Sequence, residues 1–80
     1  MKKSKVLDKR KEIGIIIANA RKAKGISQTK LALLVDMDRT TISKIETGSW
    51  SFGIDSLISI SQALDIDVIR ILPNTKNIQK

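Results

Sequence analysis

The chain has 80 residues, with 15 lysine and arginine residues against 8 aspartate and glutamate residues, and therefore a net charge of +7. It contains neither cysteine nor histidine, which excludes disulfides, thiolate or imidazole metal sites and histidine acid–base chemistry. We therefore expect one small basic domain with no cofactor, no metal and no enzymatic activity.

The first predicted helix spans about Lys9 to Lys24. Ile13, Ile17 and Ala20 recur at three- and four-residue spacing on a face that Lys24 shares. Gly25 follows as the residue best able to adopt the left-handed conformation that ends helices. Residues 1–8 are expected to form a flexible basic arm, which either lies along a polyanion or acts only through long-range attraction.

A short second helix is predicted to follow Ser27. The Ser27 side chain can accept a hydrogen bond from the first free amides of that helix. Its apolar residues Leu31, Leu34 and Val35 keep helical spacing, and Asp36 interrupts the pattern. The helix is therefore expected to end at Val35.

A third helix is predicted over Arg39 to Thr47. Asp38 can cap its start, Ile42 and Ile45 point inward, and Gly48 stops it. The turn between the second and third helices is only about three residues long, as in two-helix units with a short turn.

Two further helices are predicted after a loop over residues 49–53. The fourth begins near Asp55 or Ser56, and its expected buried residues are Leu57, Ile58, Ile60 and Leu64. A fifth follows Asp67 and ends at Pro73, with the apolar residues Val68, Ile69, Ile71 and Leu72. No strand pattern occurs, so the expected fold class is all-α with five helices.

The second and third helices form a unit whose second member can enter the major groove of DNA. Its shared core is expected to contain Leu31, Val35, Met37, Ile42 and Ile45, with the small Ala32 where the two helices cross. The polar residues near the start of the third helix are Arg39, Thr40, Ser43 and Lys44. Arginine and lysine can pair with guanine, and threonine with a base edge or the thymine methyl group, so these four are the candidate base-reading residues.

Residues Ile13 to Leu72 resemble the helix-turn-helix domain of the phage Cro and repressor family. The matching stretches are RKAKGISQ at 21–28, LA at 31–32, ISKIETG at 42–48 and ISQAL at 60–64. The resemblance implies a lambda-repressor-like fold and sequence-specific binding of double-stranded DNA. The start of the third helix, Asp38-Arg39-Thr40, also resembles the small controller proteins of restriction-modification systems.

The resemblance also assigns roles to individual residues. It places Gln28 against a phosphate and makes Arg21 and Glu46 a largely buried ion pair of architectural importance. The complete set of expected phosphate contacts is Ser27, Gln28, Lys30, Thr41, Ser49 and Trp50.

This chain departs from the family pattern at three places. Asp36 stands in the turn where relatives often have glycine, and aspartate tolerates a left-handed backbone at modest cost. The segment 49–51 is neutral where relatives are commonly basic, so Trp50 either contacts the DNA backbone or packs on the fourth helix. Ile15 and Ile16 replace polar residues and are covered either by Val6-Leu7 or by another subunit.

Two functions are compatible with these features. The first is a transcriptional regulator, a repressor or autoregulator, that binds a palindromic operator as a homodimer. Its dimer interface would contain Ile66, Val68, Ile69, Ile71 and Leu72, which could instead be buried within the monomer. The alternative is an antitoxin-like module whose main partner is another protein and whose DNA binding is autoregulatory.

Charge and hydropathy complete the prediction. Residues 1–30 carry a net charge of +8 and residues 31–72 a net charge of −3, an asymmetry typical of a polyanion-binding protein or of a solvated basic terminus. No segment resembles a secretory signal or a membrane span, and a cytoplasmic location is expected. The predicted organisation is a basic arm at 1–8, a DNA-binding domain at 9–72 and a short tail at 73–80.

Overall fold

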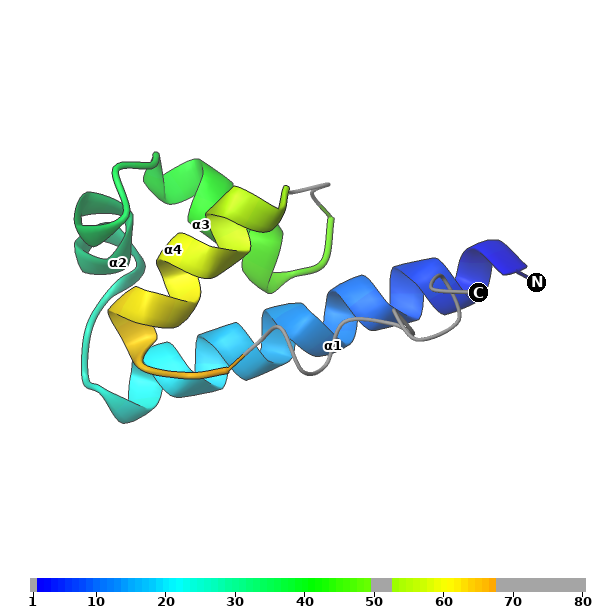
Figure 1. Cartoon of the computed structure of the whole chain (residues 1–80), viewed down its shortest axis with the longest axis horizontal. Helices are drawn as coiled ribbons and strands as arrows, with labels where there is room; N and C mark the ends of the chain where they lie inside the picture. The colour runs from blue at the N-terminus through cyan, green and yellow to red at the C-terminus, as the bar shows by residue number, and fades with distance from the viewer. Residues whose placement is uncertain (1, 50–52, 68–80) are drawn as a thin grey trace.

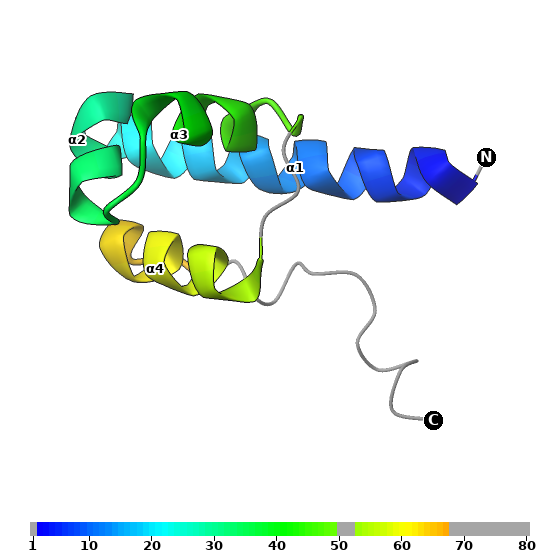
Figure 2. The same ribbon diagram turned by 90° about the horizontal axis from the view of Figure 1, so that it is seen from above.

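The computed structural model describes residues 2–49 and 53–67, and side chains from Lys9 onward. Its helices are α1 (Lys2–Ala23), α2 (Gln28–Leu34), α3 (Arg39–Glu46) and α4 (Ile54–Leu64). Helices α3 and α4 pack against α1, α2 packs against α3 and α4, and the N-terminal end of α1 extends beyond the other three helices (Figures 1 and 2). The all-α prediction is confirmed, and the predicted fifth helix lies outside the described residues.

The first helix is longer than predicted. It begins at Lys2 rather than near Lys9, so the expected arm is helical from residue 2. Residues 2–8 contain no glycine or proline and are rich in lysine, which favours helix even without an apolar face. The helix ends as expected before Gly25, which has a φ of 71°.

Local capping residues set the bounds of α2 and α3. The Ser27 hydroxyl accepts a hydrogen bond from the Lys30 amide at 2.9 Å, which confirms the predicted cap. Asp36 adopts the left-handed conformation in the turn, with a φ of 58°, and Gly48 does so after α3, with a φ of 77°. Asp38 precedes α3 as predicted, but its side chain makes no capping hydrogen bond.

All four helices contribute to one core. Its buried residues are Ile13, Ile17, Leu31, Ala32, Ile42, Ile45, Leu57, Ile60 and Leu64, and Val35, Met37 and Ile66 pack partly buried against it. The predicted burial of Ile58 was wrong, because its side chain is 40% exposed, and Leu34, which keeps the apolar spacing of α2, is 53% exposed. Ile58 follows the buried Leu57 and is therefore turned about 100° away from the core on α4, whereas Leu34 is the last residue of α2.

In the part of the chain that the structure describes, no helix combines the length and apolar character required to cross a bilayer. The same residues contain no group of three acidic side chains arranged to hold a metal ion.

Candidate nucleic-acid interface

Helix α3 presents a polar outer face. Arg39, Thr40 and Lys44 are exposed and Ser43 is half-buried, whereas Ile42 and Ile45 are buried on the inner side. An α-helix with its side chains is about 10–12 Å in diameter, and the B-DNA major groove, about 12 Å wide, can admit it. The four predicted base-reading residues therefore lie on the outer side of a helix of suitable dimensions.

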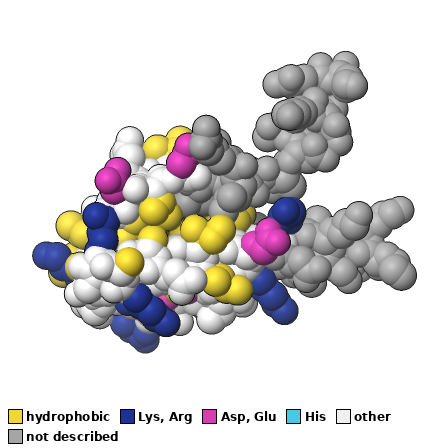
Figure 3. Space-filling model, turned by 90° about the horizontal axis from the view of Figure 1, so that it is seen from below, with side chains coloured by type: hydrophobic (Ala, Val, Ile, Leu, Met, Phe, Trp, Pro, Cys, Tyr) yellow, Lys and Arg dark blue, Asp and Glu magenta, His cyan; other side chains and the backbone are white. Residues whose placement is uncertain are grey.

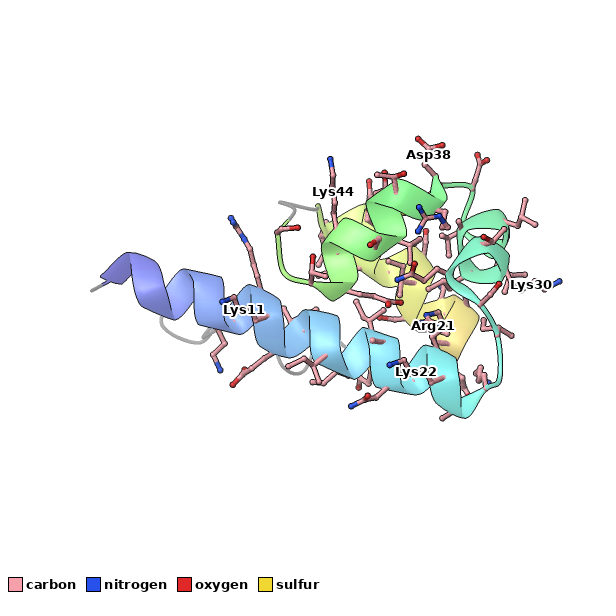
Figure 4. The ribbon with its side chains drawn as sticks, turned by 180° about the vertical axis from the view of Figure 1, so that it is seen from behind. Lys11, Arg21, Lys22, Lys30, Asp38 and Lys44 are labelled. Carbon is pink, nitrogen blue, oxygen red and sulfur yellow. The ribbon has the colours of Figure 1, made fainter. Side chains whose placement is uncertain are left out.

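A buried ion pair joins α1 to the end of α3. The Arg21 Nε donates to a carboxylate oxygen of Glu46 at 2.7 Å, and Nη2 donates to the other oxygen at 3.2 Å. The Arg21 and Glu46 side chains are only 11% and 6% exposed. A third bond, from Arg21 Nη1 to the carbonyl of Ile26 at 2.8 Å, fixes the guanidinium (Figure 4).

The environment keeps Arg21 charged. Hydrogen bonding to Glu46 raises the pKa of Arg21 above its ordinary value, burial opposes that rise, and the charge of Glu46 adds to it. The ion pair has the geometry expected from the family resemblance, and its bidentate form sets both side chains in one orientation.

The Gln28 side chain connects this ion pair to Arg39 at the start of α3. Its Nε2 donates to Glu46 Oε1 at 3.0 Å, and its Oε1 accepts from Arg39 Nη1 at 3.2 Å. A continuous chain of hydrogen bonds therefore runs from Arg21 through Glu46 and Gln28 to Arg39. The amide predicted to meet a phosphate is engaged within the protein at both of its ends.

The other predicted phosphate contacts lie in different surroundings. Lys30 is exposed on α2 and points away from the helices (Figure 4), and Thr41 is half-buried on α3. The Ser49 amide and hydroxyl both donate to the Lys44 carbonyl, at 3.0 and 3.3 Å. Trp50 lies outside the described residues.

The backbones of α1 and α3 approach closely at two glycines. A β carbon added at Gly14 would lie 2.5 Å from the carbonyl oxygens of both Ile45 and Glu46. One added at Gly48 would lie 2.8 Å from Lys11 Cγ and 2.9 Å from Lys11 Cα. This contact was not predicted from the sequence, although a glycine retained inside a helical pattern often has a packing reason.

The predicted dimer residues are only partly covered by the structure. Ile66 is half-buried and packs against the core. Val68, Ile69, Ile71 and Leu72 lie outside the described residues.

Comparison with known proteins identifies the family to which this fold belongs. Residues 17–71 match the family model described as helix-turn-helix. An uncharacterized HTH-type transcriptional regulator of Sinorhizobium fredii, y4dL, is 32% identical over 74% of the chain. The chain spans about a third of the length of that relative, 32%.

Three solved structures share the fold. The restriction-modification controller protein C.AhdI from Aeromonas hydrophila has a TM-score of 0.74 at 27% identity, covering 82% of this chain and 96% of that one. A point mutant of the controller protein C.Esp1396I gives 0.67 at 33% identity, covering 82% and 80%. The clp gene regulator ClgR from C. glutamicum gives 0.73 at 24% identity, covering 79% and 81%, and is similar in fold alone.

Proposed function

Because the chain belongs to the helix-turn-helix family of transcriptional regulators, we propose that it reads a palindromic operator by placing α3 in the major groove. The observation that carries this proposal is the outer face of α3. It presents only polar and basic side chains on a helix whose inner side is held by the core. The N-terminal residues of such a helix contact base edges.

Within this proposal, Arg39 is the principal base-reading residue. Its guanidinium is positioned by Gln28 at the first residue of α2, and an oriented guanidinium can pair with O6 and N7 of guanine. Thr40, Ser43 and Lys44 contact neighbouring bases, and Lys30, Thr41 and Ser49 contact phosphates. Phosphate contacts set the register of the protein, whereas base contacts supply the sequence preference.

The proposed regulator acts as a homodimer. One α3 reads only a few base pairs, and two copies on half-sites about 34 Å apart double the length of sequence that is read. Ile66 and the apolar residues that follow it, Val68, Ile69, Ile71 and Leu72, are proposed to form the dimer contact. Occupation of an operator that overlaps a promoter would make the protein a repressor, including of its own gene.

The test is selection of bound duplexes from a random DNA pool at about 150 mM salt, close to physiological ionic strength. We expect a palindromic consensus whose half-sites are about one helical turn apart. Sedimentation of the protein with the selected duplex should show two copies bound. Absence of any enriched sequence, with binding lost at moderate salt, would reject specific readout.

A protein partner is the second candidate, and exposed apolar side chains on α1 favour it. Ile15 is 57% exposed and Ile16 37%, and hydrophobic side chains gather along the middle of the face on which α1 lies (Figure 3). An antitoxin-like module would bury these residues against another protein. Substitution of both by serine would weaken that association and leave the selected DNA sequence unchanged.

A further inference from the structure

The chain that follows α3 carries no charge. Residues 47–53 contain no acidic or basic side chain. A helix C-terminus has a partial negative charge, and the Lys44 carbonyl at this end accepts hydrogen bonds from the neutral Thr47 and Ser49 side chains. A phosphate near the end of α3 would therefore find no cation in the segment directly after the helix.

Lys11 brings a cation to this place from a different helix. Its Cα and Cγ lie where a side chain at Gly48 would otherwise stand, at 2.9 and 2.8 Å from the position of an added β carbon. The residue is nevertheless exposed. In Figure 4 the Lys44 side chain extends outward from α3, and Lys11 lies on α1.

The position of Lys11 relative to α3 is fixed by backbone packing. Gly14, one turn further along α1, faces the carbonyl oxygens of Ile45 and Glu46 without space for a methyl group. Arg21 ties the same helix to Glu46 through two hydrogen bonds. Lys11 therefore occupies a defined place beside the end of α3. A residue in an exposed loop would lose conformational entropy to reach the same place.

We propose that Lys11 contacts a DNA phosphate beside the C-terminal end of α3 and replaces the basic loop that this chain lacks. The inference rests on the proposed DNA binding and adds α1 to the contact surface. A recognition helix lies in the major groove with its N-terminal residues against the base edges, so a cation beside its C-terminal end lies away from the bases and closer to the sugar-phosphate backbone. Lysine binds phosphate as a point charge through its flexible stem.

The experiment compares Lys11→Gln with Lys9→Gln in the full chain. Both variants remove one positive charge from α1, but the two positions are about 200° apart around the helix axis. Lys9 pairs with the exposed Glu12 at 3.2 Å, so its loss changes long-range attraction with little effect on folding. Binding to the selected duplex and to a random duplex is measured from low to high salt, after thermal unfolding has shown that both variants fold.

For Lys11→Gln we expect weaker binding to both duplexes. The slope of log K against log salt concentration should also become shallower, by about 0.9 for each subunit bound. Lys9→Gln should keep the parent slope, and Lys11→Arg should restore it. Equal losses for Lys11→Gln and Lys9→Gln, or none for either, would overturn the contact while leaving DNA binding intact. A parent protein that binds neither duplex would overturn the proposed function as well.

Discussion

The α1–α3 contact and the α2–α4 contact hold the domain together in different ways. Between α1 and α3, the backbones approach until Gly14 leaves no space for a β carbon, and a buried ion pair closes the far end. Between α2 and α4 there is an open groove of about 450 Å³ lined by Leu34, Val35, Asp36, Ser59, Gln62 and Ala63. Leu33 beside it is 74% exposed.

The difference shows which helix positions the proposed reading face of α3. A backbone-to-backbone contact has no side chains that could repack, so α3 has one place on α1. The groove between α2 and α4 leaves side chains in solvent and tolerates changes in their size. The orientation of α3 therefore depends on α1 as much as on α2, its partner in the two-helix unit.

The largest expected effect is on stability when Arg21 is removed. Arg21→Ala leaves the carboxylate of Glu46, only 6% exposed, without its cation. Breaking a buried pair from one side typically costs about 3–5 kcal/mol in the free energy of unfolding. Urea denaturation followed by circular dichroism measures the loss.

The control for this prediction removes both charges. The double variant Arg21→Met with Glu46→Leu leaves no buried ion, so it should be more stable than Arg21→Ala alone. A loss below about 1 kcal/mol for Arg21→Ala, the range of exposed pairs, would show that the pair is solvated and does not fix α1 to α3.

The second prediction concerns the close approach itself. Gly14→Ala improves helix propensity by about 1 kcal/mol, yet it places a methyl group 2.5 Å from two carbonyl oxygens. Overpacking costs about 1–3 kcal/mol, and backbone atoms cannot yield as side chains do, so we expect a lower Tm. Asn19→Ala, at an exposed position of the same helix, should leave Tm unchanged or higher. A Tm for Gly14→Ala at or above that of the parent would mean that α1 and α3 separate readily.

The sequence predicted the features that depend on local chemistry. Each of three features follows from one residue and its own backbone preference: the Ser27 cap, the left-handed Asp36 and the end of α3 at Gly48. The bounds of α2 and α3 were predicted to within a residue. The start of α1 was missed because a polar helix has no apolar period to mark it. Ile58 was misassigned to the core because spacing does not reveal how far a neighbouring helix covers a face.

The residues of the candidate site could be predicted from the sequence more readily than the hydrogen bonds that join them. Arg39 and its neighbours on α3 were predicted to read bases because polar residues on a short helix after a tight turn indicate a DNA-contacting face, and the structure shows Arg39 exposed on that helix. The engagement of Gln28 with both Glu46 and Arg39 joins residues 11 and 18 positions apart in the chain. No periodicity encodes such a contact, and it forms only when α2 and α3 are packed together.

The third prediction tests that connection on DNA. Arg39→Ala should cost about 1–3 kcal/mol on the selected duplex and little on random DNA. If Gln28 positions Arg39, Gln28→Ala should lose part of the same energy, and the two substitutions should be non-additive by at least about 0.5 kcal/mol. Additive losses, with Gln28→Ala weakening every duplex equally, would instead assign Gln28 to a phosphate. Titration of fluorescent duplexes with the parent, two single variants and the double variant separates these results.

The smallest expected effect belongs to the open side of the molecule. Leu34→Ser changes a side chain that is already 53% exposed, so the free energy of unfolding should change by no more than about 0.5 kcal/mol. The matched control is Leu31→Ala, one turn earlier on α2 and fully buried, which should cost about 2–5 kcal/mol. A large loss for Leu34→Ser that grows with protein concentration would show that another copy covers the groove between α2 and α4. The groove between α2 and α4 would then be an assembly surface. Its side chains would be exposed to solvent only in the isolated subunit.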